Sequence, residues 1–281
     1  MLLIMAAVLL FAVMDSISKY LTQFYPVLSV VWARYLLHTL LVIVALGPRL
    51  GLSLVRTRRP AAQFARGALL TAATLFFVTA IKHIPIVEAT AIQFLAPLLV
   101  TAMAVVVLKE KVEFARWVAI VCGFVGVLII IRPGSGVFTW ASLLPLATAA
   151  CFASYQILTR RLAGIENSYT SLFYTGLVGA VLLSIPLTYA WSPPQSGVHL
   201  ALFALIGILG GLGHLILIKA YDLAPASSLA PFSYTQLIWV TVAGYLAFDN
   251  IPDFWSFAGM AILMVSGIYT AMHQHRSERS A

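Results

Sequence analysis

The chain has 281 residues, of which 62% are hydrophobic and 9% are charged, and its formal net charge is +8. Soluble domains are about 45–50% apolar and about 25% charged, so this composition argues against a soluble enzyme, a nucleic-acid-binding protein and a disordered chain. The two cysteines are too few for a disulfide framework or a four-cysteine zinc site. We therefore expect an integral membrane protein with little mass outside the lipid bilayer.

Ten apolar segments follow one another along the chain, each long enough to cross a bilayer as a helix of about 20 residues. We expect spans at residues 1–21, 27–47, 61–82, 87–108, 113–131, 139–160, 168–190, 198–221, 226–247 and 253–273. The segments are too long and too continuous for the strands of a β-barrel, and the first lacks the basic flank and cleavage site of a signal peptide. The predicted fold class is an all-α integral membrane protein with ten transmembrane helices.

Four charged residues lie in or beside the first, second and fourth spans. Asp15 and Lys19 are one helical turn apart, Arg34 lies in the second span, and Glu88 opens the fourth. An Asp, Lys or Arg at the bilayer centre is unfavourable by about 2.5–3.5 kcal/mol on translocon scales, so such a residue is expected to face the protein interior with a partner. We expect a coupling or gating cluster at the outer mouth of a cavity. The alternative is a structural pair that fixes the first two helices, with Lys19 reaching the interface.

Prolines and polar side chains coincide in the fourth and ninth spans. Gln93 precedes Pro97 by one turn, and Tyr234 and Gln236 follow Pro231. Proline removes a helix hydrogen bond, which is tolerated in a membrane beside protein or a wet cavity. We expect the polar residues to bind a solute and the two prolines to act as hinges; a packing kink is the alternative.

The remaining solute-binding candidates are polar aromatic and amide side chains inside the spans, because buried Tyr and Trp need a partner for their polar atom. They are Tyr35, Tyr155, Gln156 and Trp239, joined by His214 in the eighth span. Gly210 and Gly211 near this histidine are further hinge candidates. Two alternatives stay open: a lone intramembrane histidine that joins helices by a hydrogen bond, and glycines that serve only helix packing.

The distribution of positive charge predicts the orientation. Thirteen Lys and Arg residues, Arg66 among them, are assigned to one set of loops, whereas only Lys19, Lys82 and Arg132 fall on the other set. The basic side is cytoplasmic by the positive-inside rule, so we expect a multi-pass protein of the cytoplasmic (inner) membrane with both termini in the cytoplasm. Because the net charge is then explained by topology and anionic lipid headgroups, no nucleic-acid partner is expected.

The two halves of the chain resemble each other. Ile84-Pro85 followed by a helix recurs as Ala224-Pro225 followed by a helix, at an offset of 140 residues. The halves, residues 1–133 and 134–281, each hold five predicted helices. Because five is odd, the second half must enter the membrane from the opposite face. This predicts two inverted five-helix repeats, the architecture of many secondary transporters, with a site near the midplane between them.

A longer stretch resembles a known family. It runs from Ala80 to Leu98 (AIKHIPIVEATAIQFLAPL) and on through Leu108-Lys109-Glu110 to Gly123–Gly126. These motifs resemble the ten-helix EamA-type branch of the drug/metabolite transporter superfamily, in whose second helix an arginine equivalent to Arg34 is common. The second copy departs from the pattern, because Asp249-Asn250 stands where the family has a glutamate.

The resemblance implies a secondary transporter that moves a small organic metabolite by alternating access and needs no cofactor. The solutes it implies include an amino acid, a vitamin such as riboflavin, S-adenosylmethionine and a drug-like compound; the mixed aromatic and polar candidates favour a ring-bearing one. Proton coupling through Asp15, Glu88 or His214 and a homodimer are further hypotheses. A membrane-embedded enzyme and a passive channel remain as alternatives, whereas the lack of a Walker loop excludes ATP-driven transport within this chain.

Overall fold

The computed structural model describes residues 1–107, 114–135, 138–162, 164–223 and 232–280, and within these ranges all regular structure is helical. The first half contains α1 (Leu2–Leu21), α2 (Val27–Leu50), η1 (Gly51–Leu54), α3 (Pro60–His83), α4 (Ile86–Gln93), α5 (Ala96–Val107) and α6 (Phe114–Ile131). The second half contains η2 (Trp140–Leu143), α7 (Leu144–Leu162), α8 (Ser168–Leu187), α9 (Gly197–Leu223), α11 (Thr235–Phe248) and α12 (Phe254–Ser280).

The described helices confirm the predicted all-α membrane fold. Seven helical segments are long and apolar enough to cross a membrane, and one of them combines α4 with the start of α5. Three shorter apolar helices, Trp117–Ile131, Thr235–Phe248 and Phe254–Thr270, bring the total over the described ranges to the ten that the sequence predicts. The last helix extends beyond its predicted end at residue 273, to Ser280.

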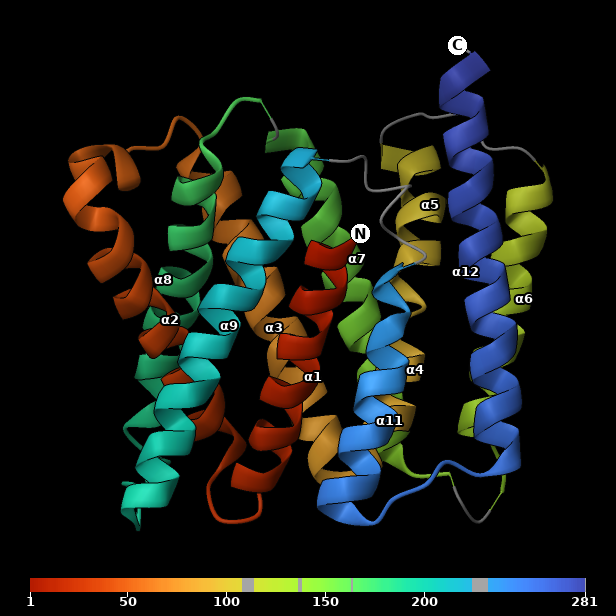
Figure 1. Ribbon diagram of the computed structural model, residues 1–281, viewed down its shortest axis with the longest axis horizontal. Helices are drawn as coiled ribbons and strands as arrows, with labels where there is room; N and C mark the ends of the chain where they lie inside the picture. Colours follow the sequence, from red (N-terminus) through yellow and green to blue (C-terminus); the bar gives the residue numbers. More distant parts are fainter. Residues whose placement is uncertain (108–113, 136–137, 163, 224–231, 281) are drawn as a thin grey trace.

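Consecutive spans run in alternating directions through the bundle (Figure 1). Both termini lie toward one end, which we call the terminal face; the other end is the opposite face. Helix α1 runs from the terminal face to the opposite face, whereas α7, which begins the second half, runs the other way. The two halves are therefore inverted relative to each other, as the odd number of helices in each predicts.

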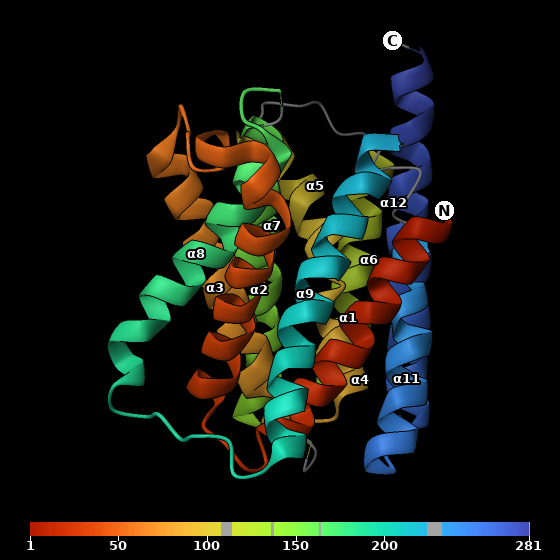
Figure 2. The same cartoon turned by 60° about the vertical axis from the view of Figure 1, so that its left-hand side comes forward.

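The packing of the helices repeats when the halves are exchanged. Helix α1 packs on α9 as α7 packs on α3, and α2 packs on α9 as α8 packs on α3. The pairs α2–α8, α4–α11 and α6–α12 each join equivalent helices of the two halves. Figure 2 shows α8 and α9 joined by a long connection at the opposite face. This exchange pattern is that of two repeats related by a pseudo-two-fold axis.

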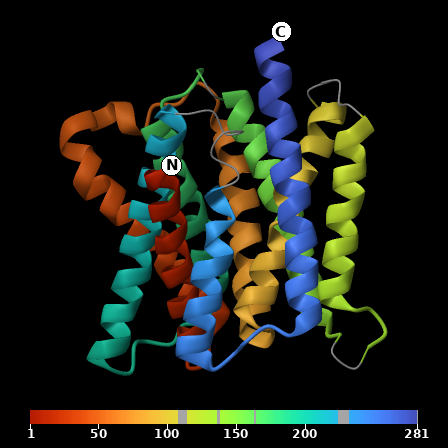
Figure 3. The same ribbon diagram turned by 45° about the vertical axis from the view of Figure 1, so that its right-hand side comes forward.

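Helices α6 and α12 form a pair at one flank of the bundle (Figure 3). They approach closely at Gly126 and Gly259: a Cβ on Gly126 would lie 2.8 Å from the carbonyl oxygen of Gly259, and one on Gly259 would lie 2.5 Å from that of Gly126. Only glycine leaves room for this contact, so the two backbones touch.

The fourth span is broken next to its proline. Helix α4 ends at Gln93, the turn at Phe94-Leu95 follows, and Pro97 lies in the first turn of α5. Because proline cannot donate a backbone hydrogen bond, the position just inside a helix start suits it. The break lies where the sequence predicts an interruption. Pro231, its predicted partner in the ninth span, falls outside the described residues.

Candidate functional site

Asp15 and Arg34 form an ion pair inside the bundle. Arg34 Nη1 donates to Asp15 Oδ1 at 3.3 Å, and the two side chains are 14% and 10% exposed. The pair joins α1 to α2 and lies against α9, since a Cβ on Gly210 would lie 3.9 Å from Arg34 Nε. Each charge therefore has the partner that burial in a membrane requires.

Lys19 has partners other than the expected Asp15. Its Nζ donates to the carbonyl oxygens of Ile81 at 2.5 Å and Ile84 at 2.8 Å, at the end of α3. In a continuing helix the Ile81 carbonyl would accept from residue 85, but that residue is Pro85 and has no N–H. The ammonium replaces this missing donor. The expectation that Lys19 pairs with Asp15 across one helical turn is therefore corrected.

Glu88 lies near further charged residues at the opposite face. Its Oε1 accepts from Ser256 Oγ at 3.4 Å, and the nearby Asp253 Oδ2 accepts from Arg132 Nη1 at 2.5 Å. Slight burial raises the pKa of Asp253, but hydrogen bonds from Ser256 and Arg132 outweigh this effect and leave the pKa below its ordinary value. The four expected cluster residues therefore do not form one contact network: Asp15 pairs with Arg34, whereas Lys19 binds carbonyl oxygens and interacts with Glu88 electrostatically at longer range.

A second buried arginine, Arg66, lies between α3, α7 and α8. The side chain is 3% exposed, and its Nη2 donates to the Ser171 carbonyl oxygen and, at 2.7 Å, to Thr175 Oγ1. Its guanidinium carbon lies 5.2 Å from the ring centroid of Tyr155, within cation–π range. The distribution of basic residues assigns Arg66 to a cytoplasmic loop. That assignment is wrong, because Pro60 begins α3 and places Arg66 in its second turn.

Two histidines from different halves continue this polar region. The rings of His38 on α2 and His214 on α9 are 5.9 Å apart, and a Cβ on Gly176 of α8 would lie 3.0 Å from the His38 ring. Gly176 follows Thr175, which contacts Arg66. His38 is buried, and its Nε2 has no hydrogen-bond partner. We call Arg66, Tyr155, His38 and His214 the inner cluster. Of these four residues, the sequence predicts only Tyr155 and His214 as site residues.

Aromatic rings connect the inner cluster to the break between α4 and α5. Tyr155 stacks on Phe152 at 5.7 Å, and Phe152 packs against the apolar core that contains Tyr234. Phe94, at the break, stacks on Tyr234 with ring centroids 4.9 Å apart. The Tyr234 hydroxyl and the Trp239 Nε1 are buried without a partner. Two residues that the sequence predicts to bind solute thus carry unused polar atoms, and the Tyr234 hydroxyl lies against Gly267 of α12.

The other predicted solute-binding residues are placed differently. The Tyr35 hydroxyl contacts the Leu70 carbonyl oxygen at 3.1 Å and Thr74 Oγ1 at 2.7 Å, so its polar atom is used to join α2 to α3. Gln93 ends α4, and Gln156 and Gln236 are half-buried on α7 and α11. Their part in solute binding stays a prediction.

The glycines of α9 are in close contact with neighbouring helices. A Cβ on Gly211 would lie 2.6 Å from Leu41 of α2, and one on Gly210 would lie 3.3 Å from Met14 of α1. Helix α9 continues through both residues without a break. They serve helix packing in this structure, and their role as hinges stays a prediction.

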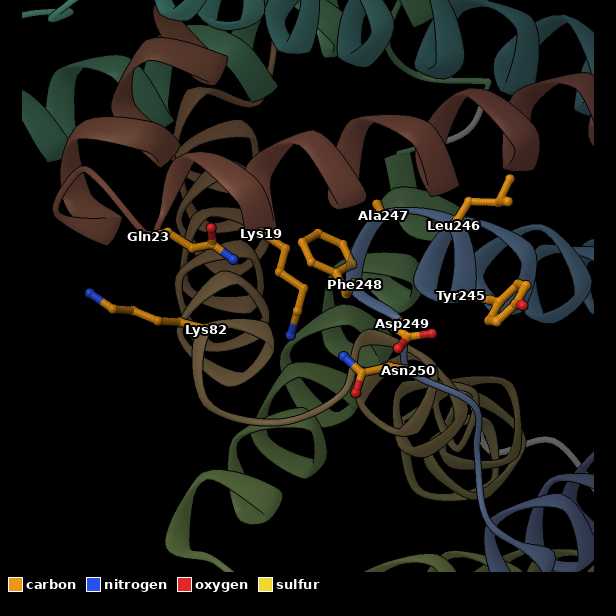
Figure 4. A pocket seen from close by; sticks show the side chains of 9 residues that line it. All are labelled: Lys19, Gln23, Lys82, Tyr245, Leu246, Ala247, Phe248, Asp249 and Asn250. Atoms are coloured by element: carbon orange, nitrogen blue, oxygen red, sulfur yellow. The ribbon is translucent and has the colours of Figure 1, made fainter.

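A pocket of about 740 Å³ opens at the opposite face between the ends of α1, α3 and α11 (Figure 4). Lys19 points toward the side formed by Asp249 and Asn250, whereas Lys82 points away from it. This pocket lies between the two halves, at the end of α1, the helix that carries Asp15. Charged side chains of both signs line it, which suits a mouth through which polar solutes pass.

The EamA-like transporter family matches residues 1–132 and 139–272, which cover both halves. The chain belongs to this family. It is therefore a multi-pass membrane transporter rather than an enzyme, and the two matched segments correspond to its two repeats.

Its relatives include transporters of different solutes. The S-adenosylmethionine uptake transporter of Rickettsia prowazekii (strain Madrid E) is 27% identical over 95% of this chain and 90% of that protein. The riboflavin transporter of Rhizobium johnstonii is 31% identical over 82% of this chain and 76% of that protein. A solved crystal structure superimposes with a TM-score of 0.69 over 98% of this chain and 97% of the other, at 20% identity, which supports the fold alone.

Proposed function

We propose that this EamA transporter moves a small ring-bearing organic solute by alternating access, binding it between its two halves. The observation that carries the proposal is that three of the buried polar atoms without partners among the described residues are His38 Nε2 on α2, the Tyr234 hydroxyl and Trp239 Nε1. A buried polar group normally has a hydrogen-bond partner, so several unsatisfied groups near an interface between repeats favour a ligand site.

The aromatic side chains favour a solute with a flat ring. Phe94 and Tyr234 are stacked beside the break, and Tyr155 and Phe152 are stacked beside the inner cluster. Rings of this kind offer apolar faces for stacking while their polar atoms set orientation. Riboflavin and S-adenosylmethionine, which the names of the relatives give as solutes, both contain a fused heteroaromatic ring. They are the first solutes to test, together with aromatic amino acids.

Counterflow in proteoliposomes tests the proposal. We expect saturable uptake of one of these labelled solutes. The same unlabelled solute inside the vesicles should accelerate this uptake, because a carrier must return its binding site to the outer side before it can take up another molecule. Linear, non-saturating flux would instead favour a passive channel. Tyr234→Phe removes only the unused hydroxyl, whereas Trp239→Phe removes the unused N–H together with part of the ring system; both should raise the half-saturating concentration. Trp255→Phe, at an exposed tryptophan near the opposite face, is the matched control.

Proton coupling is a second part of the proposal. Asp15, Glu88 and His214 are the titratable candidates, and Asp15 is joined to Arg34 in the present conformation. A carrier that moves protons with solute must show uptake that depends on an imposed pH gradient. Uptake that is indifferent to the gradient and to Asp15→Asn would remove these residues from the coupling role.

We also propose that the terminal face is cytoplasmic, since most basic loops lie there. A reporter that is active only outside the cytoplasm should then be active when it is inserted between residues 192 and 198, in the connection at the opposite face. A homodimer is a further candidate assembly, which the mass of the purified protein in detergent decides.

A further inference from the structure

Arg66 is a buried cation for which the described residues supply no counter-charge. Its described partners are a carbonyl oxygen, threonine hydroxyls and the ring of Tyr155, all of them neutral. No described carboxylate oxygen lies within 4.0 Å of its side-chain nitrogens, and its Nε has no partner at all. A guanidinium stays charged in proteins, so this charge is held out of water by neutral partners alone, without a described counter-charge.

The groups around Arg66 hold it in position and leave donors free. Thr175 and the Ser171 carbonyl oxygen, both on α8, bind Nη2, and Thr159 on α7 accepts from Nη1 at 3.4 Å. Nearby on α3, Gln63 is fully buried and its Oε1 has no partner. A planar guanidinium held at several points is pre-organised for a carboxylate or a phosphate, which it can bind through two parallel hydrogen bonds.

The position of Arg66 places it along the interface between the halves. It lies about 9 Å from the start of α3 at the terminal face, and Arg34 lies about 10 Å from the start of α2 at the opposite face, at 1.5 Å per residue. His38 follows Arg34 by one turn and faces His214. A polar path thus leads from the Asp15–Arg34 pair through the histidines toward Arg66.

We propose that Arg66 is a specificity-determining residue that binds an anionic group, a carboxylate or a phosphate, of the transported solute. The ring of the solute lies toward Tyr155 and the aromatic residues of the break, and its anionic group faces the terminal-face end of the site. This inference rests on the proposed function, because it assigns one end of the solute to one residue of the same site.

Two pairs of ring-bearing probes test the proposal, each differing only in an anionic group. Indole-3-acetate and indole-3-acetamide test a carboxylate, and adenosine monophosphate and adenosine test a phosphate. Each is added to the purified protein in a thermal-unfolding assay. We expect the anion of at least one pair to raise the melting temperature more than its neutral partner, and Arg66→Gln to abolish the difference.

Variants separate binding from folding. Arg66→Gln should be folded and at least as heat-stable as the wild type without solute, because it removes an uncompensated charge, while uptake falls roughly thirtyfold or more. Arg66→Lys keeps the charge but not the planar fork and should recover only part of the uptake. Arg56→Gln removes the same charge from an exposed position on the same face and should change neither property.

The outcomes distinguish this inference from the proposed function. If no anion stabilises the wild type more than its neutral partner, or if the difference survives in Arg66→Gln, the assignment of Arg66 is overturned. If Arg66→Gln transports as the wild type does, the inference fails while carrier function stands. If the wild type shows no counterflow of any probe or solute, the proposed function itself fails.

Discussion

Two arginines, Arg34 and Arg66, are buried in the same bundle in different electrostatic surroundings. Arg34 is paired with Asp15, whereas Arg66 lies against the ring of Tyr155. The offset of 140 residues that relates the two halves also relates Asp15 to Tyr155. An acid in the first helix of one half is thus replaced by an aromatic ring in the first helix of the other. The difference indicates that the first arginine is satisfied by the protein and the second is left for a ligand.

Breaking the satisfied pair should have the largest effect on stability. Arg34→Gln or Asp15→Asn leaves one buried charge alone, which costs about 3–5 kcal/mol when a buried pair loses one partner. The double variant should recover most of this loss. Unfolding of the purified protein in detergent measures all three. Single variants as stable as the wild type would show that the pair is open to water.

A methyl group added beside Arg66 should reduce the stability of the protein more than one added beside Arg34. A Cβ on Gly67, next to Arg66, would lie 2.6 Å from Val178 Cβ, so Gly67→Ala must push α8 away and should cost about 1–3 kcal/mol. A Cβ on Gly210, beside Arg34, would meet the flexible sulfur of Met14 at 3.3 Å and Arg34 at an ordinary contact distance of 3.9 Å, so Gly210→Ala should cost less. The same thermal-unfolding assay compares them. Equal losses would contradict the close packing of α3 on α8.

A carboxylate placed beside Arg66 would make its surroundings resemble those of Arg34. Tyr155→Glu should supply the missing counter-charge and stabilise the solute-free protein by about 1 kcal/mol, since charge-assisted hydrogen bonds exceed the cation–π contact that is lost. It should also abolish uptake, because the glutamate occupies the anion's place. Tyr155→Gln is the neutral control of similar size. A glutamate variant less stable than the glutamine variant would refute this account of Arg66.

The exposed ion pair between Asp253 and Arg132 at the opposite face should contribute least to the stability of the protein. Asp253 is bound to Arg132, and its side chain is 46% exposed, so the pair is worth at most about 1 kcal/mol. Because its pKa is lowered on folding, its stabilisation is complete above the ordinary value of 3.8 and is lost as the pH falls through the lower folded value. Melting temperatures against pH should therefore differ between wild type and Asp253→Asn above this value and converge below it.

The sequence predicts the fold better than the site. Runs of apolar residues place most spans within a few residues, although the last helix extends seven residues beyond its predicted end at 273, and Pro97 indicates the broken fourth span, because these signals are local. The environment of Arg66 depends on α7 and α8, which are distant in sequence, so the sequence alone places this charge, which is near a span end, in a loop. The partner of Lys19 was missed although Pro85 is a local signal: a proline there leaves the Ile81 carbonyl without a backbone donor.

The contact between Gly126 and Gly259 has a mechanical consequence. It joins the last helix of each half, α6 and α12, backbone to backbone at the flank of the bundle. A motion that opens one face and closes the other must leave this seam intact or lose its contacts. In the alternating-access motion proposed above, the α6–α12 seam would then stay fixed while the remaining helices move relative to it.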